Sequence, residues 1–182
     1  LRQAGSRLQG HPDMRKLPGV DMSAGSLGMG ISAGIGMALA GKLSGQRYHV
    51  YVLVGDGELQ EGQNWEAFLA ARKFSLDNLT VIVDRNGVQL DGKTEDIMPM
   101  GNLAEKIAAF GWQVSTCDGH DCASILTAVE HARKATGVPT AIVANTIKGK
   151  GVSFMEGQSA WHGAPISIEH YETARRDLEA QP

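Results

Sequence analysis

Two short apolar runs, residues 50–54 and 79–83, enclose a segment with helical spacing at residues 61–74. Each run ends abruptly in glycine and polar residues, GDG at 55–57 and DRNG at 84–87. A buried strand, a helix and a second buried strand in this order form a unit that is typical of parallel sheets. The pattern predicts that residues 48–91 form the strand–helix–strand unit around which the rest of the fold is built.

The same alternation of strands and helices continues on both sides of this unit. Two further strands are expected at residues 113–117 and 140–145. The predicted helices cover residues 29–40, 61–74, 103–110, 121–136 and 167–179. Residues 1–20, 91–100 and 146–165 are expected to be loops, because glycine, proline and polar residues interrupt every period there. Alternating strands and helices predict an α/β fold with a doubly wound parallel sheet.

Local signals refine two of these helices. Asp121 is a plausible N-cap for the helix at 121–136, and Gly137 is a plausible stop. The helix at 29–40 contains Gly34 and Gly36, although glycine inside a helix costs about 1 kcal/mol relative to alanine. We therefore expect another element to pack closely against the helix at these two positions.

Two polar side chains, Asp56 and Asn86, follow the carboxyl ends of the first two strands, the edge at which open α/β sheets bind ligands. Carboxylate and amide oxygens suit a hard cation such as Mg²⁺, or Ca²⁺ or Mn²⁺, and Mg²⁺ is usually bound together with phosphates. Val88 offers a backbone carbonyl just after the second turn. Asp-Gly and Asn-Gly also occur in ordinary turns, but the pairing of the two across a strand–helix–strand unit favours a metal site.

Composition limits the class of protein. The 182 residues fit one domain, residues 1–182, with 42% hydrophobic and 20% charged residues. The net charge of −3 gives no argument for binding nucleic acid or an anionic membrane. Cys117 and Cys122 lack metal-ligand spacing and are expected to be reduced thiols in a cytoplasmic protein. No apolar run approaches the roughly 18 residues of a transmembrane helix.

A series of motifs, taken together, resembles transketolase, and most closely the N-terminal subunit of the split, two-chain bacterial type. GDG at 55–57 followed by Asn86 resembles the thiamine diphosphate motif. The other motifs occur in the family's order: GHP at 10–12, LPGV at 17–20, GSLG at 25–28, DGHD at 118–121, KGKG at 148–151 and HGAP at 162–165. The resemblance covers nearly the whole chain and implies a family segment ahead of Gly10 that this sequence lacks.

The resemblance implies a thiamine diphosphate-binding domain that helps to move a two-carbon ketol unit between sugar phosphates, with the cofactor as electron sink. It implies Mg²⁺ ligands at Asp56, Asn86 and the Val88 carbonyl. It also implies cofactor contacts by Gly25, Leu27, Gly55, Asp56, Gly57, Glu61 and Asn86. His11 and His162 resemble the family histidines that contact the sugar and act as catalytic groups.

The resemblance also implies a partner chain. The glutamate that activates the cofactor in this family lies on a pyrimidine-binding domain, which this sequence does not contain. We therefore expect a C-terminal transketolase subunit to be the partner, together with self-association. The helix at 29–40 and the pair Trp65 and Phe68 are expected to offer uncovered apolar surfaces for these contacts.

Three other interpretations stay open. A deoxyxylulose-phosphate synthase or a 2-oxo acid dehydrogenase component shares the metal motif but matches GSLG, KGKG and HGAP less well. A binding or regulatory module of the same fold that has lost catalysis is the third alternative.

His120, in the DGHD motif, is expected to be structural, with its side chain satisfying backbone groups of a turn.

Overall fold

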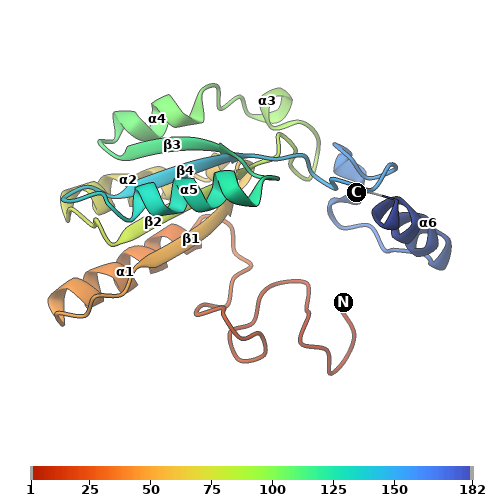
Figure 1. Ribbon diagram of the computed structural model, residues 1–182, viewed down its shortest axis with the longest axis horizontal. Helices are drawn as coiled ribbons and strands as arrows, with labels where there is room; N and C mark the ends of the chain where they lie inside the picture. The colour runs from red at the N-terminus through yellow and green to blue at the C-terminus, as the bar shows by residue number, and fades with distance from the viewer. Residues whose placement is uncertain (1, 181–182) are drawn as a thin grey trace.

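The computed structural model describes residues 2–180 and contains one sheet of four parallel strands. The strands lie in the order β1-β2-β4-β3 (Figure 1). Their bounds are Val50–Gly55 for β1, Leu79–Arg85 for β2, Gln113–Asp118 for β3 and Thr140–Asn145 for β4. Gly55 pairs with Asp84, and Arg85 pairs with Asn145, so all the strands end at one common edge.

Helices cover both faces of the sheet, as the doubly wound prediction requires. One face carries α1 (Met29–Leu43), α2 (Gly62–Lys73) and α4 (Leu103–Ala109), whose buried side chains share one hydrophobic cluster with the strands. The other face carries α5 (Cys122–Ala132), which packs on β3 and β4 through a second cluster (Figure 1). A core on each face explains why β2 reads as an almost continuous apolar run.

An aromatic group anchors the larger cluster. Phe68 is fully buried, and the ring of Trp112 stands edge-on to it at 4.8 Å between centroids. Trp65 and Phe110 complete the group, and the indole N–H of Trp112 donates to the Phe68 carbonyl at 2.9 Å. The segment between α4 and β3 covers Phe68, so the expectation of an uncovered apolar surface is wrong for Phe68, whereas Trp65 is half-buried.

Helix α1 packs on β1 and β2 through its smallest residues. A Cβ atom at Gly34 would lie 2.4 Å from the side chain of Val52, which confirms the close approach expected there. A Cβ atom at Gly36 would meet nothing within 4 Å, so the same expectation is wrong for Gly36, which faces outward. The sheet buries Ile31, Gly34, Ile35 and Ala38, so this face of the helix is not the open surface that we expected.

Most element boundaries lie within two residues of the predicted ones, and three features differ. Helix α1 continues to Leu43, beyond the predicted end at residue 40. The predicted loop at 91–100 contains a one-turn helix, α3 (Thr94–Ile97). Helix α5 ends at Ala132 instead of residue 136, because the chain tightens into turns in which Lys134 N–H bonds the His131 carbonyl. Asp121 is the N-cap as expected, accepting from Ala123 N–H at 3.0 Å, whereas Gly137 lies beyond the helix.

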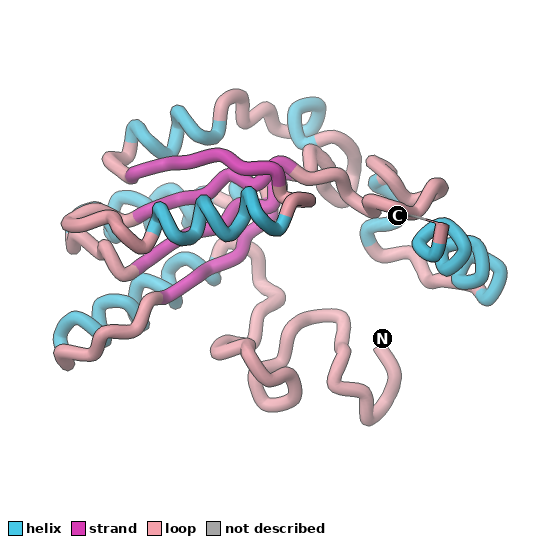
Figure 2. Tube along the Cα trace, in the orientation of Figure 1, coloured by secondary structure: helices cyan, strands magenta, loops and turns pink. Residues whose placement is uncertain are grey.

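The two ends of the described chain lie away from the sheet. Residues 2–28 form no helix or strand, as Figure 2 shows. After β4 the chain passes through a 3₁₀ turn, η2 (Ser159–His162), and a final helix, α6 (Ile168–Glu179), with Ser167 capping the latter. A further 3₁₀ turn, η1 (Glu58–Gln60), follows β1 directly.

Across residues 2–180, no helix combines the length and the apolar character that crossing a bilayer requires.

Candidate metal and diphosphate site

Asp56 lies directly beyond β1 and is only 3% exposed. Its Oδ1 atom accepts a hydrogen bond from Gly57 N–H at 3.0 Å. Its Oδ2 atom accepts from Gly87 N–H at 2.8 Å and from the Thr94 hydroxyl at 3.3 Å. The carboxylate is thus held in one orientation by donors from three segments.

Burial raises the pKa of Asp56 above its ordinary value, and the nearby charge of Asp84 raises it further. The hydrogen bonds from Gly87, Gly57 and Thr94 oppose this increase without cancelling it. Across residues 2–180, no basic side chain forms an ion pair with Asp56. A buried, oriented carboxylate that lacks a cation is costly when ionised, and a bound metal ion would stabilise its charged form.

Asn86 and Val88 lie in the turn after β2, next to Asp56. The Asn86 side-chain oxygen accepts from Val88 N–H at 3.1 Å, and Val88 forms a β-bridge with Lys93 that closes the turn. Asp56 and Asn86 line the same cavity of about 240 Å³, in which Arg85 and Lys93 supply positive charge. The structure therefore brings the two predicted side-chain ligands together, and the oxygen donors fit a hard cation.

Gly57 must be a glycine for steric reasons. A Cβ atom there would lie 2.8 Å from the Cβ atom of Gln89, so the turn after β1 packs directly against the turn after β2. Gly55 has open space at the corresponding position. The close contact at Gly57 fixes the position of the turn after β1 relative to the turn after β2.

The GSLG loop reaches this region from the N-terminal side. Gly28 N–H donates to Glu58 Oε1 at 3.0 Å, and a Cβ atom at Gly28 would lie 3.0 Å from the Cβ atom of Glu61. Residues 25–28 therefore lie against η1, directly after the Asp56 turn. Leu27 is 58% exposed in this loop. Gly28 and Glu61 thus lie close to each other just after the turn at 55–57, and Gly25 and Leu27 belong to the loop that ends at Gly28.

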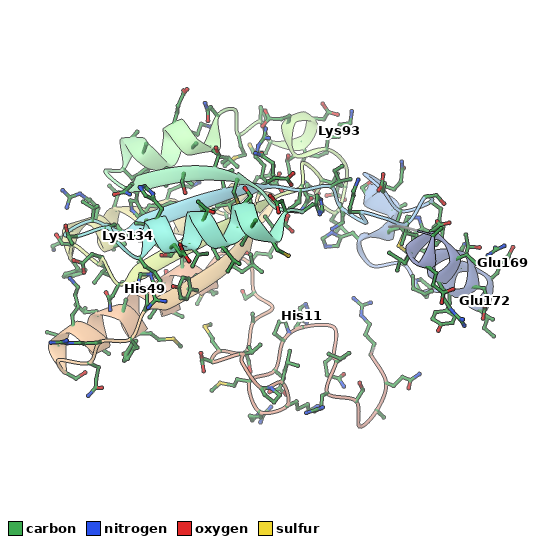
Figure 3. All side chains as sticks on the ribbon, in the orientation of Figure 1. His11, His49, Lys93, Lys134, Glu169 and Glu172 are labelled. Carbon is green, nitrogen blue, oxygen red and sulfur yellow. The ribbon has the colours of Figure 1, made fainter. Side chains whose placement is uncertain are left out.

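His11 joins the same cluster. Its imidazole lies 3.2 Å from the position that a Cβ atom on Gly25 would occupy, and Ala24 N–H bonds the Pro12 carbonyl at 3.2 Å. The segment at 11–14 and the loop before α1 thus support each other. Figure 3 shows His11 on the N-terminal segment, well away from His49 near the start of β1.

His162 is the last residue of η2 and is exposed. Partial desolvation, followed by the charge of Lys148, lowers its pKa below the ordinary value. Its neighbour Trp161 stands edge-on to His170 at 4.8 Å between ring centroids, which attaches η2 to α6. Within residues 2–180, no hydrogen bond joins His162 to Asp56 or His11, so the structure does not bring these predicted residues into contact.

Two observations concern residues outside the predicted site. Thr94 is 4% exposed and supplies the only side-chain hydroxyl on Asp56 in the described chain, yet nothing in its sequence surroundings marks it. His120 accepts from Ile147 N–H at 2.7 Å, which confirms the structural role expected for it. Thr94 is therefore the missed member of the site, found only from the fold.

Comparison with known proteins is consistent with this geometry. The family model described as "Transketolase, thiamine diphosphate binding domain" matches residues 1–182. The 6-deoxy-6-sulfo-D-fructose transketolase subunit SqwG of a Clostridium species is 45% identical over 181 residues, covering 100% of this chain and 66% of that protein. An apulose-4-phosphate transketolase subunit of Actinobacillus succinogenes is 44% identical, covering 96% of this chain and 63% of that protein.

A solved structure extends the likeness to three dimensions. The transketolase of Campylobacter jejuni superposes with a TM-score of 0.88 at 33% identity, over 98% of this chain and 29% of that one. This chain therefore spans less than two thirds of the subunit relatives, 66% and 63%, and 29% of the longer Campylobacter chain.

Proposed function

The chain belongs to the transketolase family as a thiamine diphosphate-binding domain, and from this premise we propose that residues 1–182 are one domain that forms the diphosphate half of a two-chain transketolase active site. The observation that carries the proposal is Asp56, a buried carboxylate that three donors orient and that pairs with no basic side chain within residues 2–180. Ketol transfer between sugar phosphates is favoured over the related reactions, because both subunit relatives are named transketolases.

In this proposal Asp56, the Asn86 side-chain oxygen and the Val88 carbonyl hold Mg²⁺. Gly25, Leu27, Gly55, Gly57 and Glu61 line the cofactor, and His11 and His162 orient the sugar and exchange protons with it. Bound thiamine diphosphate supplies an electron sink for the transferred two-carbon unit. The residues of this chain fix the metal, exclude alternative orientations of the diphosphate and place imidazoles at the open side of the site.

The proposal includes a partner subunit that carries a pyrimidine-binding domain. Leu27, within the GSLG loop, is 58% exposed, and Met29, the first residue of α1, is 44% exposed. An apolar side chain exposed next to a cofactor loop favours contact with a second chain. This replaces Phe68, which the core buries, as the expected contact surface.

A coupled assay of ketol transfer tests the function. The chain, combined with its partner subunit, Mg²⁺ and thiamine diphosphate, should transfer a two-carbon unit from at least one ketose phosphate of a panel to an aldose phosphate. Decarboxylation of a 2-oxo acid by the same mixture, without ketol transfer, would instead support one of the alternative enzyme classes. A complex that binds the cofactor and performs neither reaction would support the non-catalytic module.

Thr94→Val tests the support of the metal ligand. Valine keeps the shape of threonine and removes the hydroxyl that bonds Asp56 Oδ2, so the carboxylate loses one of three donors. Because a hydrogen bond to a charged group contributes about 1.5–3 kcal/mol, the Mg²⁺ concentration for half-saturation should rise by roughly tenfold. Thr94→Ser keeps the hydroxyl and is the matched control; equal Mg²⁺ dependence in the valine and serine variants contradicts the assignment.

His162→Ala tests the second histidine. Its exposed position in η2 means that the fold and most of the cofactor affinity should survive. Turnover per folded molecule should fall by roughly a hundredfold, the scale of a lost general acid–base group. Steady-state kinetics of the two-chain complex measures this, with circular dichroism to count folded protein. A variant that unfolds but keeps full turnover in its folded fraction would make His162 structural.

A further inference from the structure

Glu58 connects two parts of the site that come from distant segments. It lies two residues after Asp56, in η1, and its Oε1 atom accepts from Gly28 N–H at 3.0 Å across thirty positions of sequence. Gly28 has φ = 82° and is the N-cap of the fifteen-residue helix α1. The carboxylate of Glu58 thus occupies the first free N–H group of that helix, where a negative charge is stabilised.

The backbone of Glu58 is itself held by a hydrogen bond from α2. Asn64, which is fully buried in α2, donates from Nδ2 to the Glu58 carbonyl at 2.6 Å. Gly28 also lies close to Glu61, since a Cβ atom on Gly28 would be 3.0 Å from the Cβ atom of Glu61. Gly28, which ends the loop at 25–27, is therefore held between the side chain of Glu58 and Glu61 at the start of α2.

We propose that Glu58 is a positioning residue that couples the loop at 25–27 to the metal turn, so that the two bind one cofactor as a single rigid surface. This inference rests on the proposed function. Glu58 does not touch the metal in this account: its carboxylate is committed to Gly28, whereas Asp56 and Asn86 line the metal cavity. Its effect is to reduce the conformational freedom that the loop would otherwise lose on binding.

Two ligands separate this role from a general structural one. Pyrophosphate with Mg²⁺ contacts the metal turn alone, whereas thiamine diphosphate also needs the loop at 25–27. Calorimetric titration of both ligands into the complex of the chain with its partner subunit compares wild type with Glu58→Ala and Glu58→Gln. Asp77→Ala is the control, because Asp77 likewise accepts from a glycine, Gly137 N–H at 2.8 Å, but at the amino edge of the sheet.

Glu58→Ala should weaken thiamine diphosphate by about tenfold or more, the scale of a charge-assisted hydrogen bond, and leave Mg²⁺-pyrophosphate within about twofold. Glu58→Gln keeps an acceptor oxygen and should recover most of the loss, and Asp77→Ala should change neither affinity. Equal weakening of both ligands, or no weakening of either, overturns the inference. Wild type that binds neither ligand overturns the proposed function itself, and the inference with it.

Discussion

Replacing Asp56 with asparagine is expected to abolish Mg²⁺-dependent binding of thiamine diphosphate. In the proposed site the metal loses its only charged protein ligand, and the new amide nitrogen faces a backbone N–H in either orientation, because Gly57 and Gly87 donate to the two oxygen positions. Removing one partner of a buried charge pair typically costs several kcal/mol, so affinity should fall by roughly a hundredfold or more. Titration calorimetry at saturating Mg²⁺ measures the loss.

Asp118→Asn is the matched control for this experiment. Asp118 is the last residue of β3, at the far side of the sheet from β1, and it also accepts a backbone N–H, that of His120 at 2.8 Å. The control should bind the cofactor like wild type. If Asp56→Asn binds thiamine diphosphate with unchanged affinity and unchanged Mg²⁺ dependence, Asp56 is an ordinary turn residue and the site lies elsewhere.

The second large effect concerns the partner subunit. Under the proposed function the isolated domain should show no ketol transfer above background, because the proposed site also needs the pyrimidine-binding domain of the partner. Mixing it with the pyrimidine-domain subunit should create activity, and affinity for thiamine diphosphate should rise as the second half of the ligand gains contacts. Activity titrated against partner, together with light scattering of each mixture, measures both.

Leu27→Ser provides an internal test of this second prediction. The side chain is 58% exposed beside the cofactor loop, so the substitution should weaken association with the partner. The matched control is Leu126→Ser, since Leu126 is 63% exposed on α5, which covers the opposite face of the sheet. A monomer that turns over sugar phosphates by itself would contradict the split-site proposal.

The sequence predicts the elements well because their signals are local. The strand at Thr140–Asn145 agrees to the residue, and Asp121 caps its helix as expected. The sequence also predicts that Asp56 and Asn86 lie near each other, since strand ends in a parallel sheet converge on one edge. Where the prediction fails, at the end of α5 for example, tight turns formed by the backbone replace a helix that composition alone allows.

Contacts between distant segments are not readable from the chain. Thr94 meets Asp56 across thirty-eight positions, and Glu58 meets Gly28 across thirty, so no local pattern marks either residue. The burial of Phe68 depends on Phe110 and Trp112, which only the return of the chain through α4 brings against it. His162 remains a prediction from resemblance, because no hydrogen bond within residues 2–180 connects it with Asp56.

The most direct test of the account is anomalous diffraction from a crystal of the chain with its partner subunit, grown with Mn²⁺ and thiamine diphosphate. Mn²⁺ takes the oxygen ligands that suit Mg²⁺ and can be located by its absorption edge. The account predicts one peak per chain, bonded to the Asp56 carboxylate, the Asn86 side-chain oxygen and the Val88 carbonyl, with the diphosphate completing its shell. A metal peak bonded to other residues, or a cofactor whose diphosphate lies away from this edge of the sheet, would contradict it.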